Sequence, residues 1–165
     1  VVASGTDPAR MVHGFDTVSI CLSKGLGAPV GSVLVGSKAD LAQAHRWRKM
    51  FGGGMRQAGV IASAGLYALE NNIERLSEDH RRAKIFAEAV ADMPKYSINL
   101  DNVQSNIVFI EVGKGNTEMI IKKLSKHGID ILSIDESTIR AVFHLHITDE
   151  NLETAIDAFS KVSLS

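Results

Sequence analysis

One lysine, Lys24, is the residue whose type and surroundings most directly indicate chemistry. It lies in the segment Ser23 to Ser32, which holds three glycines and follows the apolar, strand-like residues 17–22. A charged ammonium at the end of a buried strand is costly unless it forms an ion pair or reacts as an amine. The glycines permit a tight turn and leave room beside that amine. This pattern suits a lysine that forms a Schiff base with an aldehyde cofactor or substrate, with a surface or ion-paired lysine as the alternative.

A second group of residues indicates an anion-binding site. Arg46, Arg48, Lys49 and Arg56 surround the triglycine 52–54. The last of these arginines immediately precedes a predicted apolar helix, and a helix N-terminus together with a guanidinium group forms a good anion site. A solvated helix face is the alternative for the two arginines before the glycines.

Arg140 is a third candidate, because it alternates with Ile139 and Ala141 in a short predicted strand. An arginine among apolar strand residues needs a carboxylate partner. That partner is either a substrate carboxylate or, in a purely structural role, a neighbour such as Asp135 or Glu136.

A pair of histidines follows this strand. His144 and His146 lie on one face of an extended segment, an arrangement compatible with metal binding. No third ligand has a convincing spacing, so we predict no metal site.

The elements that position these side chains follow from apolar periodicity and from the positions of Gly and Pro. We expect a short helix from Thr6–Pro8 to His13, strands 17–22 (buried) and 31–36, helices 38–50, 57–71 and 72–93, and then strand 107–112, helix 117–128, strands 129–133 and 138–142, and helix 148–163. Pro94 ends a helix, and we place a domain boundary there. The predicted domains are residues 1–94 and a small α+β domain of residues 95–165.

Composition narrows the function classes. The chain has 165 residues, 45% hydrophobic and 22% charged, with a net charge of -1. This balance gives no reason to expect nucleic acid, and no apolar run reaches membrane-spanning length. The single cysteine, Cys21, cannot form an internal disulfide. We therefore expect a globular, cytoplasmic protein with no nucleic-acid or membrane partner.

Three segments resemble one known family. Residues 19–32, SICLSKGLGAPVGS, are similar to the lysine segment of the low-specificity L-threonine aldolases, which depend on pyridoxal phosphate. Residues 46–59, RWRKMFGGGMRQAG, resemble a second block of that family, and residues 138–144, TIRAVFH, resemble a third more loosely. The blocks occur in the family's order, and the resemblance covers nearly the whole chain.

The resemblance implies both a fold and an activity. The fold would be α/β: part of the large domain of fold type I transferases that use pyridoxal 5'-phosphate, followed by a small α+β C-terminal domain. The activity would be cleavage of L-threonine and related β-hydroxy-α-amino acids to glycine and an aldehyde. A related β-eliminating lyase or racemase is the alternative within the enzymes. A non-catalytic interaction module is the alternative outside them.

The resemblance also implies residue roles and partners. Lys24 would carry the cofactor, Arg56 and Lys49 would lie near the cofactor, and Arg140 would bind the substrate carboxylate. Family members run to about twice this length, so we interpret the chain as a C-terminal half that is inactive alone. Its partners would be the N-terminal half of the same enzyme and further copies in a dimer or tetramer, with Arg56 reaching a neighbour's site.

Overall fold

The computed structural model describes residues 1–162, and contacts divide the chain into two compact units, Val1–Arg75 and the residues from Leu76 onward. The helix that precedes Pro94 belongs to the second unit, because its apolar face packs against the C-terminal residues. The division into residues 1–94 and 95–165 concerns the domains of a complete enzyme and stays a prediction.

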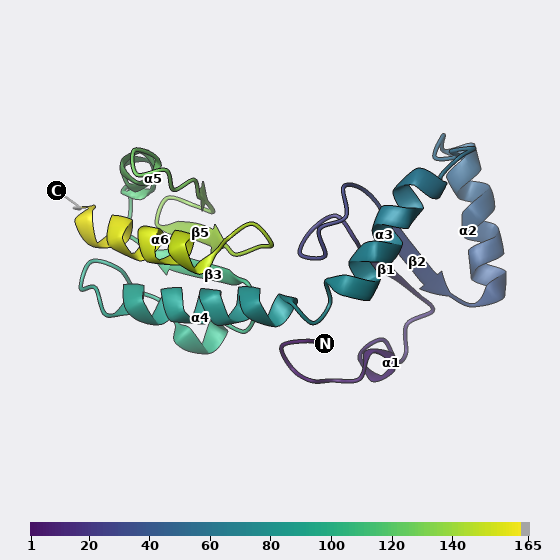
Figure 1. Cartoon of the computed structure of the whole chain (residues 1–165), viewed down its shortest axis with the longest axis horizontal. Coiled ribbons are helices and arrows are strands. Elements are labelled where there is room, and N and C mark those ends of the chain that lie inside the picture. Colours follow the sequence, from purple (N-terminus) through teal and green to yellow (C-terminus); the bar gives the residue numbers. More distant parts are fainter. Residues whose placement is uncertain (163–165) are drawn as a thin grey trace. The chain divides into compact units, whose positions relative to one another are not determined.

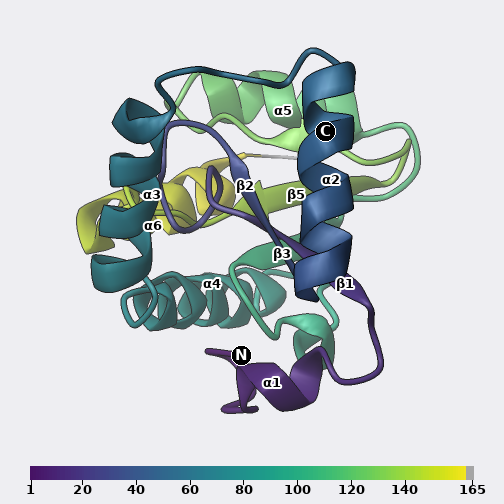
Figure 2. The same ribbon diagram turned by 90° about the vertical axis from the view of Figure 1, so that its right-hand side faces the viewer.

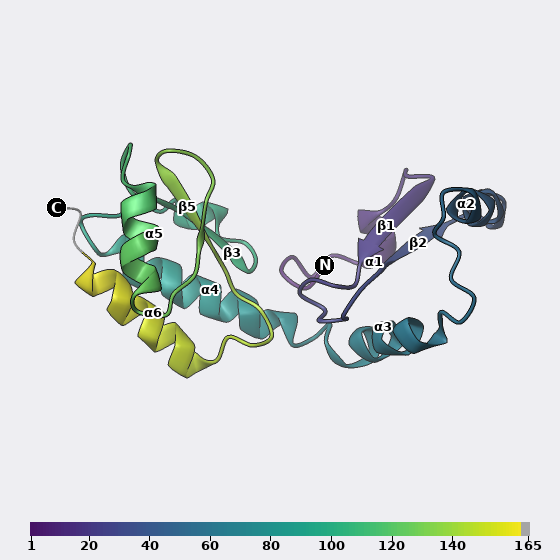
Figure 3. The same cartoon turned by 90° about the horizontal axis from the view of Figure 1, so that it is seen from above.

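The first unit is a two-stranded ribbon with three helices. Its elements are α1 (Pro8–Met11), β1 (Thr17–Cys21), β2 (Ser32–Gly36), α2 (Lys38–Met50) and α3 (Gly59–Asn71). β1 and β2 are antiparallel, with Thr17 opposite Gly36 and Cys21 opposite Ser32. Figure 3 shows α2 following directly from the end of β2. The type and order of these elements agree with the sequence prediction.

The expectation of a buried strand at residues 17–22 is wrong for this chain. Every residue of β1 is at least partly exposed, and only the following Leu22 is buried. β1 pairs with β2 alone among the described residues, and neither strand has a buried residue, so no packed layer covers the faces of this ribbon.

Side-chain caps explain where the helices begin. The carboxylate of Asp7 accepts a hydrogen bond from the backbone N–H of Arg10 at 3.1 Å, and Pro8 occupies the first turn of α1. The hydroxyl of Ser37 accepts from the N–H of Asp40 at 3.2 Å at the start of α2. Each cap satisfies a backbone donor that the helix itself leaves without a partner.

The second unit is a three-stranded antiparallel sheet covered by helices. Its elements are α4 (Leu76–Ala91), the 3₁₀ turn η1 (Leu100–Asn102), β3 (Ile107–Glu111), α5 (Thr117–Ser125), β4 (Leu132–Ser133), β5 (Thr138–Val142) and α6 (Asp149–Lys161). The strand order is β3-β5-β4, so β5 is central and lies beside β3 (Figure 2). The small α+β arrangement agrees with the sequence prediction, although β4 is shorter than expected.

The core of the second unit is formed by the sheet and the helices α4, α5 and α6, of which α4 and α6 are neighbours (Figure 1). Alternate residues of the strands, such as Val108, Ile110 and Ile139, are fully buried in this core. The rings of Phe86 and Phe159 meet edge-on with their centroids 5.1 Å apart. This aromatic contact joins the two helices and adds to the stabilisation from apolar burial.

None of the helices formed by residues 1–162 is long and apolar enough to cross a membrane.

Candidate active site

Lys24 lies in a tight loop between β1 and β2. The backbone N–H of Gly27 donates to the carbonyl of Lys24 at 2.8 Å, which closes a turn over residues 24–27. Gly27 adopts φ +75°, a conformation that favours glycine. The side chain of Lys24 is exposed. The burial cost that the sequence suggested for the ammonium is therefore absent in this chain, but the amine is free to meet a ligand.

Two further backbone bonds close the base of this loop. The N–H of Leu22 donates to the carbonyl of Gly31 at 3.0 Å, and the N–H of Ala28 donates to the carbonyl of Leu22 at 3.0 Å. Beside the loop, the hydroxyl of Ser23 lies 3.5 Å from the thiol of Cys21, and this hydrogen bond lowers the pKa of that partly exposed thiol. Backbone hydrogen bonds thus close both the turn and the base of the loop.

The loop packs on α3. Leu22 and Ala28 form a small buried cluster with Ala68, and Gly65 of α3 is itself buried. A Cβ atom added at Gly65 would lie only 3.0 Å from a methyl group of Leu22, so this glycine permits the close approach. Gly65 and Ala68 of this helix therefore support the lysine loop.

Two polar side chains beyond α3 reach the same loop, and sequence reasoning missed both. The amide of Asn72 donates to the carbonyl of Leu26 at 2.7 Å. Nη1 of Arg75 lies 3.5 Å from the carbonyl oxygen of Gly25. They are separated from the loop by about 50 positions, and nothing in their local sequence pattern pointed to it.

The triglycine makes room for two long cationic side chains. A Cβ atom at Gly53 would lie 3.0 Å from Cγ of Arg48, and one at Gly54 would lie 2.7 Å from Cδ of Lys49. The sequence predicted that backbone here approaches another group closely. The structure identifies that group as the pair of side chains from the end of α2.

These cations line an open cavity of about 490 Å³, bounded by His45, Arg46, Arg48, Lys49, Met50, Gly54, Met55 and Arg56. Arg56 lies three residues before α3, whose N-terminus has no side-chain cap. Four cationic side chains around one open cavity suit a phosphate or carboxylate. The structure brings Lys49 and Arg56 together here, as the sequence suggested. Lys24 is not among the residues that line this cavity.

Arg140 lies on the central strand of the other unit. It is opposite Phe109 of β3 and Leu132 of β4, both of which are largely exposed, so it belongs to the sheet face away from the core. Its Nε atom is buried and has no hydrogen-bond partner among the described residues. A buried donor without a partner is costly and fits an external anion.

The alternative structural ion pair for Arg140 does not form within the described chain. Asp135 instead accepts hydrogen bonds from the backbone N–H of Ser137 at 2.7 Å and of Thr138 at 2.9 Å, which lower the pKa of its exposed carboxyl. Glu136 pairs with Lys114 at 3.5 Å. Arg140 is therefore available to a ligand.

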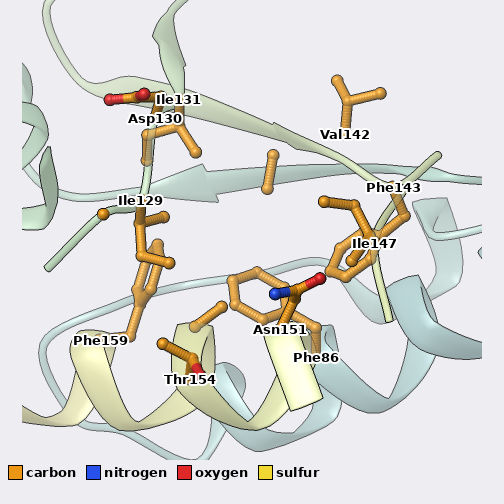
Figure 4. A pocket seen from close by; sticks show the side chains of 13 residues that line it. Phe86, Ile129, Asp130, Ile131, Val142, Phe143, Ile147, Asn151, Thr154 and Phe159 are labelled. Atoms are coloured by element: carbon orange, nitrogen blue, oxygen red, sulfur yellow. The ribbon is translucent and has the colours of Figure 1, made fainter. Parts of the chain in front are cut away.

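Two other features lie apart from the predicted site residues. The rings of His144 and His146 lie 5.7 Å apart at right angles, and residues 1–162 contain no cluster of three potential metal ligands. A cavity of about 270 Å³ in the second unit lies between α6 on one side and residues 129–131 and β5 on the other (Figure 4). Its lining is mainly apolar, and none of the predicted site residues contributes to it.

Comparison with known proteins identifies the family. The sequence model described as Beta-eliminating lyase matches residues 1–112, which is more than half of the chain. The chain belongs to the beta-eliminating lyase family. The family resemblance stated from the sequence is thereby confirmed at this level.

Relatives in this family carry an aldolase name. Low-specificity L-threonine aldolase 1 of Arabidopsis thaliana is 38% identical over 99% of this chain, and the match covers 47% of that protein. The chain thus spans about half the length of the curated relatives it matches.

Solved structures confirm the predicted fold class. A Listeria monocytogenes protein described as an L-allo-threonine aldolase has a TM-score of 0.78 and 19% identity over 97% of this chain and 48% of its own. An aminotransferase of Streptococcus suis that depends on pyridoxal phosphate has a TM-score of 0.66 and 14% identity over 88% of this chain and 41% of its own. The mixed α/β fold is therefore part of the fold type I transferase architecture.

Proposed function

We propose that these residues form the second half of a pyridoxal-phosphate-dependent aldolase that cleaves L-threonine and L-allo-threonine to glycine and an aldehyde. The observation that carries the proposal is the match to a named threonine aldolase over 99% of the chain. The site residues support it, because an exposed amine, a cationic cavity and an arginine with a buried free donor are the groups that this chemistry needs. A cytoplasmic location, favoured by the single free cysteine, is part of the proposal.

The residues present fit the cofactor. Pyridoxal phosphate has an aldehyde, which an amine can bind covalently, and a phosphate, which cations and helix N-termini bind. Lys24 offers the amine, on a loop whose glycines leave space beside it. Arg56 and Lys49 offer cationic groups in one cavity, and Arg56 lies three residues before α3. When bound, the cofactor supplies an electron sink for the carbon that loses its bond.

The reaction breaks the bond between Cα and Cβ. The β-hydroxyl loses its proton and becomes the aldehyde carbonyl, while the electron pair left on Cα takes up a proton to give glycine. Arg140 would hold the substrate carboxylate through a bidentate pair and so fix the orientation of the bond that breaks. Lys24 would hold the cofactor until the substrate amine displaces it.

The direct test assays the complete protein that carries these residues. With pyridoxal phosphate it should release glycine and acetaldehyde from L-threonine, and Lys24→Ala should abolish turnover. Lys38→Ala, which changes an exposed lysine at the start of α2, is the matched control and should remain active. Borohydride reduction and peptide mapping should place the adduct on Lys24. An adduct on Lys38 or Lys49 instead would overturn the assignment.

The role of Arg140 can be tested separately. Arg140→Lys keeps the charge but loses the planar fork, so kcat/KM for L-threonine should fall by about tenfold or more. Arg10→Lys, an exposed position in α1, is the control. An unchanged kcat/KM for Arg140→Lys would leave that arginine without a role in substrate binding.

The proposal includes a homo-oligomer, a dimer or tetramer, in which Arg56 serves a neighbouring subunit. Lys24→Ala and Arg56→Ala proteins should each be impaired. Mixed in equal amounts and allowed to exchange subunits, they should recover about a quarter of the normal activity, because half of the dimers then contain one intact site. Failure to recover activity after proven exchange would place Arg56 in the site of its own subunit.

A further inference from the structure

The turn that carries Lys24 is held by side chains from outside the loop. Of its four residues, the middle two are Gly25 and Leu26, and both of their carbonyl groups point to the segment that follows α3. The Leu26 carbonyl accepts a hydrogen bond of 2.7 Å from Asn72, and the Gly25 carbonyl lies 3.5 Å from a guanidinium nitrogen of Arg75. The contact with Asn72 is the shorter and better defined.

Asn72 is placed for this contact by the end of α3. It is the C-cap residue of the helix, and its own backbone N–H donates to the carbonyl of Ala68 at 2.9 Å. Ala68 also belongs to the buried cluster under the loop. The same helix end therefore supports the loop by apolar contact and reaches over it with an amide.

We propose that Asn72 is a positioning residue for Lys24. Its amide fixes the plane of the peptide that follows Leu26, and through the turn it fixes where the lysine side chain begins. The lysine chain is long and flexible, so the turn sets where that chain begins and thereby limits where the amine can reach. Misplacement of a reacting group by about 1 Å can cost up to about a hundredfold in rate. This inference rests on the proposed function, in which Lys24 holds the cofactor.

The chemistry of the contact explains why asparagine is suitable. The Leu26 carbonyl is an acceptor in a partly buried place, so it needs a donor. An amide supplies one, whereas a carboxylate would present oxygen to oxygen. Asn72→Asp keeps the shape of the side chain and replaces this donor, which makes it the most specific substitution.

The neighbouring residue offers a matched control. The amide of Asn71 donates at 2.8 Å to the carbonyl of Tyr67, which lies in the same helix, and the contact is exposed. Asn71→Asp therefore makes the same chemical change one position away without touching the loop.

The first measurement is amide hydrogen exchange in the complete protein without cofactor. In Asn72→Asp, the amides of Gly27 and Ala28, which donate within the loop, should exchange about tenfold faster than in the unsubstituted protein. In Asn71→Asp they should be unchanged. If Asn72→Asp fails to fold, Asn72→Leu removes the donor without adding charge, and the same two amides should then exchange about fivefold faster than in the unsubstituted protein. Equal exchange in all variants that fold would overturn the inference.

The second measurement uses added pyridoxal phosphate. Asn72→Asp should slow reductive trapping on Lys24, shift the pH midpoint of the bound cofactor's visible absorbance, and lower kcat more than it changes KM. If the Asn72→Asp protein forms the Lys24 adduct at the unsubstituted rate and has the unsubstituted spectrum, the inference about Asn72 is wrong, while the proposed function stands. Absence of an adduct on Lys24 in the unsubstituted protein would overturn the proposed function first, and the inference with it.

Discussion

The two compact units differ sharply in how much apolar surface they bury. Among the described residues, the first unit buries three apolar side chains together, Leu22, Ala28 and Ala68, whereas the second buries seventeen in one cluster. Yet the first unit carries Lys24 and the cationic cavity. Within this chain, burial therefore stabilises mainly the second unit, since burial supplies most of the free energy of folding.

The first unit also exposes much apolar surface. Large apolar side chains are exposed at many of its positions, including Phe15, Val35, Met50, Phe51 and Tyr67. Exposed apolar surface of this extent marks an interaction site. We expect it to contact the rest of the aldolase that the proposed function requires.

The largest expected effect comes from separating the units. A fragment of residues 76–165 should be soluble and unfold cooperatively, because its core lies within it. A fragment of residues 1–75 should lack a cooperative transition, since three buried side chains do not offset the loss of chain entropy. Circular dichroism during heating measures both. A cooperative transition in the fragment of residues 1–75 would show that the first unit is stable by itself, and the proposed difference in stability between the units would be wrong.

Core truncation sharpens the comparison at single residues. Phe86→Ala should lower the free energy of unfolding by about 3–5 kcal/mol, because the ring is fully buried between α4 and α6. Leu22→Ala should cost about 2 kcal/mol, since its cluster is small. Trp47 is the only tryptophan, so its fluorescence follows the first unit, while circular dichroism follows both.

In urea, Phe86→Ala should shift the circular dichroism transition and leave the Trp47 transition in place. Leu22→Ala should shift the Trp47 transition and leave in place the part of the circular dichroism change that belongs to the second unit. If each substitution moves both transitions equally, the units unfold as one and the proposed difference in stability between them is wrong.

The sequence predicted regular elements well, but their surroundings less well. Turn residues and apolar periodicity are local signals, and they located all five strands and the main helices. Burial depends on what lies opposite, and for this reason β1 was expected to be buried and is not. The helix predicted from residue 72 begins at Leu76, so the short segment that carries Asn72 was hidden within it.

The candidate site shows the same limit. Lys24, Lys49, Arg56 and Arg140 were singled out from their local context together with the family resemblance, and their roles stay predictions. Asn72 was not singled out, because an asparagine at a helix end is common and only the folded chain brings it to Leu26. Residues that position others over long sequence distances leave no local pattern.

The response to alkaline pH tests the second unit, whose core contains Tyr96. Burial raises the pKa of Tyr96 to about 12, and its hydroxyl donates to the carbonyl of Phe159 at 3.1 Å. The folded pKa exceeds the unfolded value, so the stabilisation is complete below about pH 10 and is lost as the pH rises through the folded pKa. The loss should reach about 2 kcal/mol near pH 12.

Urea titrations from pH 9 to 12, about the range over which a phenol titrates, would measure this loss. Tyr96→Phe should reduce this alkaline loss of unfolding free energy. Tyr67→Phe, at a 63% exposed position in the first unit, should leave the loss unchanged. An equally steep loss in Tyr96→Phe would assign the alkaline instability to another group.

The smallest effect compares two helix caps of the same kind. Thr148 forms a capping box with Asn151 at the start of α6, and Ser37 caps α2 through the N–H of Asp40. Removing such a hydroxyl costs a helix about 1 kcal/mol wherever it occurs. α6 buries Leu152, Ala158 and Phe159, whereas α2 buries no residue. Fraying of α6 therefore exposes part of the core, while fraying of α2 exposes no buried residue.

Thr148→Ala should lower the free energy of unfolding by about 1 kcal/mol, and Ser37→Ala should lower it by no more than a few tenths of a kcal/mol. Urea titrations of the two variants measure both changes. Equal losses of unfolding free energy would show that α2 is packed as firmly as α6, and the proposed difference in burial between the two units would then be wrong for the complete protein.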